Sequence, residues 1–132
     1  MEDKHLTSAA PMALFVDSEF TGHAGGKLKF KIECDALSDE DIETIASIIA
    51  RSYTFRSVHG IPRGGLRLAK ALQKHCSAEG SVLIVDDVLT SGASMEEAKK
   101  KIGSAIGIVI FARGIRPNWV KAVFELSAWA GP

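Results

Sequence analysis

A run of thirteen residues, Val82 to Ser94 (VLIVDDVLTSGAS), constrains the fold more than any other feature of the chain. Its first four residues are all apolar, which is typical of a strand buried on both faces of a parallel sheet. Asp86 and Asp87 follow directly, and a loop of small residues then leads into a helix predicted over 93–102. A strand, a loop and a helix in this order indicate an α/β fold, with a mostly parallel sheet flanked by helices.

The neighbouring segments continue this alternation of strands and helices. A short strand predicted at 57–59 leads through a Pro/Gly-rich turn into a helix over about 66–75, and a later strand is predicted over 105–112. Ser38 can cap an earlier helix, since apolar residues recur after it at helical spacing. These residues are Ile42, Ile45, Ala46, Ile49 and Tyr53.

Composition and charge exclude several classes of function. The chain has 132 residues, which suits one compact domain, and its 16 Lys and Arg balance 16 Asp and Glu. Because no broad basic field results, we expect no nucleic-acid partner. No apolar run approaches the roughly 18 residues that span a membrane, and Cys34 and Cys76 fit no metal-binding spacing. The N-terminal residues lack the order of a signal peptide, so we expect a cytoplasmic protein.

The loop after the two aspartates has the chemistry of a phosphate site. Gly92 and Ala93 let backbone N–H groups approach a ligand closely, and the helix N-terminus adds positive potential. Thr90, Ser91 and Ser94 add hydroxyl donors. Because the carboxylates would repel a phosphate, they face either ribose hydroxyls or a divalent cation. The unit therefore indicates a sugar phosphate; the simpler alternative is a helix cap beside two solvated aspartates.

Residues 82–94 resemble the signature with which type I phosphoribosyltransferases bind PRPP (5-phosphoribosyl 1-pyrophosphate). The resemblance implies a Rossmann-like sheet in which Asp86 and Asp87 hold the ribose 2′- and 3′-hydroxyls and Thr90–Ser94 holds the 5′-phosphate. It also implies a homodimer, and Mg²⁺ bound through PRPP oxygens and water, with no protein ligand assigned. The implied reaction is substitution at C1 of PRPP by a nucleobase nitrogen, with release of pyrophosphate.

A second motif, His59 to Gly65 (HGIPRGG), follows a predicted strand. A Pro/Gly turn at such a place is by itself more often a connection than a site. Beside the first motif it resembles the pyrophosphate loop of the family, in the GxPRGG form of orotate phosphoribosyltransferases. The implied pyrophosphate site consists of Ile61, Pro62, Arg63 and Gly64. Three of these residues, all but Pro62, would offer backbone amides, and the Arg63 side chain would help the pyrophosphate depart.

Residues 20–35 resemble the N-terminal hood of orotate phosphoribosyltransferases. Apolar and charged residues alternate over 27–33, which predicts a half-exposed strand after a glycine-rich turn. Phe30 matches the residue that these enzymes have at the corresponding position. His23 stands where these enzymes usually have a lysine that contacts the substrate. Both are candidate base-binding residues; the alternative is a surface hairpin with an incidental histidine.

We expect one domain over 1–132, within which a lead-in and a small hood can be distinguished. We expect a lead-in over about 1–13 and a small hood formed by about 14–36 with 113–132. The apolar tail would pack on the hood or form a subunit contact.

Two further candidates concern the base. Residues 110–113 resemble the strand end whose arginine reads the orotate carboxylate, although Ala112 replaces the usual aspartate. Arg113 is therefore a base reader or a simple surface arginine. Residues 116–120 resemble the stretch with which purine phosphoribosyltransferases stack a base. Trp119 would then stack on a nucleobase; the alternative is that Trp119 packs against the rest of the protein. Orotate is the favoured base.

The segment between the two motifs is short. Active orotate phosphoribosyltransferases have a helix, a strand and a long closing loop there, whereas Leu66 to Gly80 provides fifteen residues, enough for a helix and a turn. Lys74 and His75 would supply some cationic character or a helix C-terminal charge. Two functions stay open: an orotate-like phosphoribosyltransferase of pyrimidine biosynthesis, and a non-catalytic regulatory protein that binds PRPP or a nucleotide. Unrelated sugar-phosphate chemistry on the same scaffold is a third.

Overall fold

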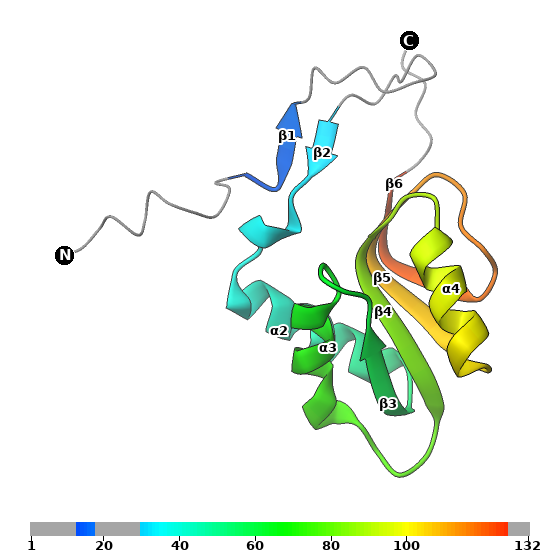
Figure 1. Cartoon of the computed structure of the whole chain (residues 1–132). Coiled ribbons are helices and arrows are strands. Elements are labelled where there is room, and N and C mark those ends of the chain that lie inside the picture. Colours follow the sequence, from blue (N-terminus) through cyan, green and yellow to red (C-terminus); the bar gives the residue numbers. More distant parts are fainter. Residues whose placement is uncertain (1–12, 18–29, 127–132) are drawn as a thin grey trace. The chain divides into compact units, whose positions relative to one another are not determined.

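The computed structural model describes residues 13–17 and 30–126. The chain divides into two compact units, residues 1–38 with 129–132 and residues 39–128. The described part of the first unit contains two strands and a 3₁₀ turn (Figure 1), namely β1 (Phe15–Asp17), β2 (Phe30–Ile32) and η1 (Cys34–Ala36). β1 and β2 pair antiparallel, and the rings of Phe15 and Phe30 meet edge to face at 5.9 Å. The strand predicted over 27–33 is confirmed over its described residues.

The second unit is built on one parallel sheet. Its elements are α2 (Asp39–Ser52), β3 (Phe55–Gly60), α3 (Leu66–Leu72), η2 (Gln73–His75), β4 (Ser81–Leu89), α4 (Ala93–Ile102), β5 (Ile106–Arg113) and β6 (Val120–Leu126). The strand order is β3-β4-β5-β6, and each neighbouring pair is parallel. The predicted α/β fold with a parallel sheet is therefore confirmed, and the carboxyl ends of all four strands meet at one edge.

β4 is the buried centre of this sheet, as its apolar sequence predicts. Leu83, Ile84 and Val85 are all 0% exposed. Ile84 packs in one cluster with Met95 and Ala98 of α4. Because successive side chains of a strand point to opposite faces, Leu83 and Val85 face the other side. Helices therefore cover both faces of β4, with α4 on one side and α3 on the other, and α2 packs against α3 (Figure 1).

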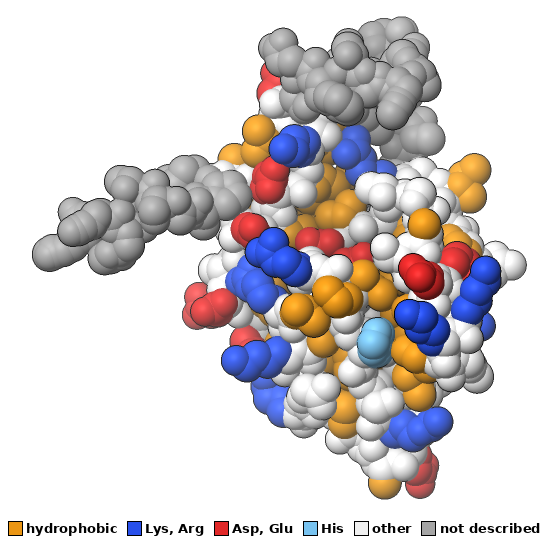
Figure 2. All heavy atoms as spheres, in the orientation of Figure 1, with side chains coloured by type: hydrophobic (Ala, Val, Ile, Leu, Met, Phe, Trp, Pro, Cys, Tyr) orange, Lys and Arg blue, Asp and Glu red, His pale blue; other side chains and the backbone are white. Residues whose placement is uncertain are grey.

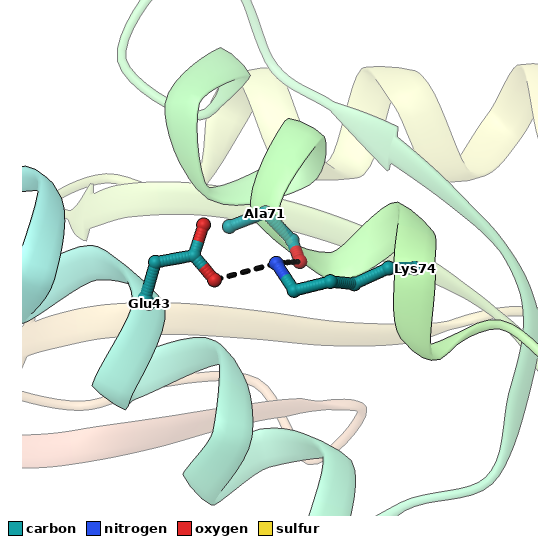
Figure 3. A network of polar contacts seen from close by, with 3 residues as sticks. All are labelled: Glu43, Ala71 and Lys74. Carbon is teal, nitrogen blue, oxygen red and sulfur yellow. Dashed lines mark hydrogen bonds and ion pairs between the residues drawn. The ribbon is translucent and has the colours of Figure 1, made fainter.

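Apolar side chains and two exposed ion pairs, Arg67–Asp39 and Lys74–Glu43, hold α2 against α3 and η2. Ile42, Ile45, Ala46 and Ile49 form the buried stripe of α2, in agreement with the predicted spacing. Lys74 in η2 forms an ion pair with Glu43 of α2 and donates a hydrogen bond of 3.1 Å to the carbonyl oxygen of Ala71 (Figure 3). Exposed ion pairs contribute only about 0–1 kcal/mol, so the apolar stripe dominates this contact.

β6 is the main difference from the sequence analysis, which predicted no strand after Ala112 and assigned 113–132 to the hood. Parallel strands usually need a connection of about a dozen residues, and Gly114–Trp119 provides only six. Six residues can return along a seven-residue strand only if they are nearly extended. Arg116 holds this connection, because its guanidinium donates to the Val120 carbonyl oxygen and forms an ion pair with Glu125.

None of the described helices is long and apolar enough to cross a membrane.

The packing of α3 gives a first test of the fold. Leu72 is 0% exposed, so the change Leu72→Ala should lower the free energy of unfolding by roughly 2–5 kcal/mol. Urea denaturation monitored by far-UV circular dichroism measures this loss. A loss below about 1 kcal/mol would show that α3 does not pack on the sheet as described, and exposed Leu66 provides the control substitution Leu66→Ala, with a small effect.

Candidate functional site at the carboxyl edge of the sheet

Asp86 and Asp87 lie among the last residues of β4, and their surroundings differ. β4 does not end before them but continues through both to Leu89. Asp86 lines a small pocket of about 60 Å³ together with residues 88–95. Asp87 lies against the loop that follows β3, because a Cβ atom at Gly64 would stand 2.5 Å from each of its carboxylate oxygens. The Asp86 carboxylate therefore faces the loop before α4, and the Asp87 carboxylate faces the loop after β3.

The predicted phosphate loop surrounds the pocket beside Asp86. Gly92 adopts a left-handed conformation with φ of 85° immediately before α4, which favours glycine at this position. Its carbonyl oxygen accepts the first hydrogen bond of the helix, from Glu96 N–H. The Ser91 hydroxyl accepts a hydrogen bond of 3.2 Å from Ala93 N–H. The residues predicted to hold a phosphate, from Thr90 to Ser94, thus line one pocket at the N-terminus of α4.

The second motif forms a tight loop beside the first. Gly60, the last residue of β3, pairs in register with Val85. Ile61 N–H extends this ladder by donating to the Val85 carbonyl oxygen at 2.9 Å, and Gly65 N–H donates back to the Ile61 carbonyl oxygen at 2.8 Å. The peptide bond between Pro62 and Arg63 is cis.

The Ile61 amide is therefore committed to the sheet. The sequence analysis offered it to pyrophosphate, and the structure instead gives Ile61 a packing role, since its side chain is 6% exposed in the core. Among the residues that the structure describes, the amides of Arg63 and Gly64 make no hydrogen bond. Two backbone donors and the exposed Arg63 side chain are thus available on this loop.

Two adjacent glycines allow the loops to meet. A Cβ atom at Gly65 would lie 2.3 Å from the Val85 carbonyl oxygen, and one at Gly64 would collide with Asp87. The sequence analysis placed Gly64 at the pyrophosphate and missed its contact with Asp87. The signal was present in the paired glycines, since glycine is the residue that permits such close backbone approach.

Burial gives Asp86 unusual electrostatics. The pKa of Asp86 is raised from 3.8 to about 7, mainly because burial removes hydration, and to a smaller extent because of a hydrogen bond to the Asp87 carboxyl and the charge of that group. The Asp87 N–H, which donates to Asp86 Oδ1 at 2.8 Å, opposes part of this increase. Asp87 Oδ1 accepts a hydrogen bond of 2.7 Å from Val88 N–H. Near pH 7 the Asp86 carboxyl can therefore accept hydrogen bonds when ionised and donate one when protonated.

The base-binding candidates are dispersed. Arg113 is the last residue of β5 and lies half-buried at the same carboxyl edge as the aspartates. Phe30 belongs to the other unit, where it contacts Phe15, and His23 lies outside the described residues.

Trp119 lies elsewhere. It directly precedes β6, and its carbonyl oxygen accepts a hydrogen bond from Gly107 near the start of β5, so it occupies the amino edge of the sheet. Its indole N–H donates to Glu96 at 2.9 Å, and Lys99 lies 5.3 Å from the ring centroid. The structure thus shows the packing alternative and does not bring Trp119 to the aspartates.

The segment from Leu66 to Gly80 forms α3, η2 and a turn, without a further strand or an extended loop, as its length predicted. α3 begins at the site and runs back towards the amino end of β4. Lys74, in η2 beyond the end of α3, contacts Glu43 and the Ala71 carbonyl oxygen (Figure 3), so the charge of Lys74 lies at the helix terminus.

Across 13–17 and 30–126 no cluster of three or more His, Cys, Asp or Glu side chains is placed to hold a metal ion. Figure 2 shows basic and acidic side chains interspersed on the visible face.

Comparison with known proteins supports the fold. No protein-family model and no curated protein matches the chain. Orotate phosphoribosyltransferase from Aeropyrum pernix matches with a TM-score of 0.62 and 18% identity, over 85% of this chain and 88% of that one. The Francisella tularensis enzyme of the same name matches at 0.60 and 17%, over 85% and 80%. A hypothetical protein from Neisseria gonorrhoeae with bound ppGpp matches at 0.51 and 15%, over 68% and 81%. The chain thus has the fold of type I phosphoribosyltransferases, as expected.

The contact between Gly64 and Asp87 can be tested by a double-mutant cycle. Gly64→Ala should displace the Asp87 carboxylate, because the new methyl group occupies its place, and should lower the free energy of unfolding by roughly 0.5–3 kcal/mol. In an Asp87→Ala background the same change should have little effect, since no carboxylate is left to displace. Urea denaturation measures the free energy of unfolding of the four proteins, and equal losses in both backgrounds would contradict the contact.

The pKa of Asp86 predicts how stability depends on pH. A raised pKa means that the folded protein holds this proton more tightly than the unfolded chain, so burying Asp86 lowers stability as the pH rises from about 4 to about 7. Asp86→Asn should therefore stabilise the protein at pH 8 by roughly 1–2 kcal/mol, allowing for partial solvation. Relative to the wild type, little of this gain should appear at pH 4.5. Thermal unfolding at the two pH values measures the difference, and a pH-independent effect would refute it.

Proposed function

We propose that this protein binds PRPP at the carboxyl edge of its sheet and transfers the 5-phosphoribosyl group to a nucleobase, with orotate as the favoured base. The observation that carries the proposal is the meeting of two loops across Gly64 and Asp87. A phosphate pocket on one side of the aspartates and two available amides beside Arg63 on the other fit the two phosphorylated ends of PRPP. The ribose between them would lie over the aspartates.

Each part of the edge has a task in this reaction. The loop Thr90–Ser94 binds the 5′-phosphate through backbone and hydroxyl donors. Asp86 and Asp87 accept hydrogen bonds from the ribose hydroxyls and orient C1. The amides of Arg63 and Gly64, with the Arg63 guanidinium, hold the departing pyrophosphate. The bond from C1 to the pyrophosphate oxygen breaks as the base nitrogen forms its bond to C1, so positioning and charge stabilisation supply the catalysis.

Mg²⁺ fits this arrangement without a dedicated protein cage. It usually keeps several water molecules and binds substrate phosphates with one or two carboxylates, and Asp87 lies against the pyrophosphate loop. When bound with PRPP, the ion would neutralise charge on the leaving pyrophosphate. The proposed setting of the protein is the cytoplasm, because Cys34 and Cys76 are far apart in the sequence and fit a reducing compartment. Its proposed assembly is a homodimer, which follows from the resemblance of the sequence to type I phosphoribosyltransferases.

A second function is favoured by one observation. Residues 66–80 contain a helix and a turn where a loop would be needed to close over PRPP. Closure of such a loop excludes water and completes many active sites. A protein without it can bind PRPP or a nucleotide and act as a regulator, and the Neisseria gonorrhoeae protein of the same fold was solved with bound ppGpp.

Calorimetry with PRPP and Mg²⁺ tests the shared binding step. Asp86→Ala combined with Asp87→Ala should weaken PRPP binding at least about 100-fold, since hydrogen bonds to charged groups contribute roughly 1.5–3 kcal/mol each. The matched control is Glu79→Ala, which removes an exposed acid at the opposite end of β4. Unchanged affinity in the double variant would contradict the proposed site.

Pyrophosphate release then separates the two functions. The protein with PRPP and Mg²⁺ is given orotate and each purine base in turn. Release with orotate supports the enzyme and its favoured base, and release with a purine corrects the base. Tight PRPP binding without release for any base favours the regulator.

A further inference from the structure

The side chain of Phe124 is an exposed aromatic surface at the carboxyl edge, in the apolar tail that was expected to pack on the hood or form a subunit contact. Within residues 39–126 it is the only aromatic side chain that is largely exposed, at 46%. Trp119, the aromatic residue that the sequence suggested for the base, packs at the opposite edge. If a base is held by an aromatic ring of this unit, Phe124 is the available one.

The register of the sheet places Phe124 level with the site. Val88, which directly follows Asp87, pairs with Phe111 on β5, and Phe111 pairs with Phe124 on β6. Neighbouring strands lie about 4.8 Å apart, so Phe124 stands roughly 10 Å from β4 along this row. Arg113 lies two residues beyond Phe111 on the intervening strand and pairs with Leu126. Asp87, Arg113 and Phe124 therefore lie near the same carboxyl edge of the sheet, on β4, β5 and β6 respectively.

The ring of Phe124 is held in place on one side. It stacks on Phe111 with centroids 5.4 Å apart and an angle of 28° between the rings. Phe111 itself is only 6% exposed and so is fixed in the core. A ring supported in this way presents its other face without needing to be ordered on binding, which lowers the entropic cost of stacking a ligand.

We infer that Phe124 is the stacking surface for the nucleobase, so that a flat heteroaromatic ring lies against it, with Arg113 beside the ring to read an anionic substituent. This inference rests on the proposed function and names one of its specificity-determining residues. A planar base with a carboxylate suits this combination, because the ring stacks on the phenyl group and the guanidinium pairs with the carboxylate.

The test separates the aromatic face from apolar bulk. Phe124→Leu keeps an apolar side chain without a π-face, whereas Phe124→Tyr keeps the ring. Base binding is measured in the presence of PRPP and Mg²⁺, as the KM for orotate if pyrophosphate is released, or as the Kd for orotate by NMR titration if it is not. We expect a rise of about 5- to 150-fold in Phe124→Leu and little change in Phe124→Tyr.

Two controls make the result specific. PRPP affinity, measured by calorimetry without a base, should stay within about twofold in both variants, and thermal unfolding reports whether they fold. Ile115→Ser is the matched surface control, because Ile115 is 95% exposed on the connection after β5 and is not in the row of Phe124.

The outcomes distinguish this inference from the proposed function. Weaker base binding in Phe124→Leu, with unchanged PRPP affinity and rescue by tyrosine, supports it. PRPP binding with unchanged orotate affinity in a folded Phe124→Leu variant overturns the stacking role and leaves the proposed function standing. Failure of the wild-type protein to bind PRPP overturns both.

Discussion

The close approach of the loop after β3 to the carboxylate at the end of β4 is the constraint on which the site depends. Parallel pairing continues past Gly60, because Ile61 N–H still donates to the Val85 carbonyl oxygen. That bond holds the loop so near β4 that only glycine fits at the next two contacts, Gly64 and Gly65. One backbone hydrogen bond and two missing side chains therefore bring a group of available amides against an aspartate.

The same proximity explains why the two aspartates have different properties. Asp86 lies in the pocket of the phosphate loop, where burial raises its pKa to about 7. Asp87 faces the other loop and satisfies part of its hydrogen-bonding capacity with Val88 N–H. Adjacent residues of a strand point in opposite directions, so a pair of acids at a strand end naturally serves two subsites. A buried carboxylate costs stability, and its retention at this edge agrees with a functional role.

The central unit could be predicted from sequence because its pattern is local. An apolar strand, two acids and a small-residue loop predicted the start of β4 and both ends of α4, although β4 continues past the acids to Leu89, and the length of 66–80 predicted α3 and a turn. The position of Trp119 could not be predicted, since it depends on the direction of β6, which is parallel to β5 although only six residues connect the two strands. The hydrogen bond from Ile61 N–H to the Val85 carbonyl oxygen also could not be predicted, because residue types do not show at which residue the hydrogen bonds of a strand end.

We propose above all that the loop after β3 and the loop before α4 bind one ligand together. Amide chemical shifts recorded during a titration with PRPP and Mg²⁺ test it residue by residue. We expect the amides of Arg63 and Gly64 to shift together with those of Gly92 and Ala93, along one binding curve, while Ile61 N–H keeps its protection from hydrogen exchange. Shifts confined to one loop, or located between α2 and α3, would contradict a shared site.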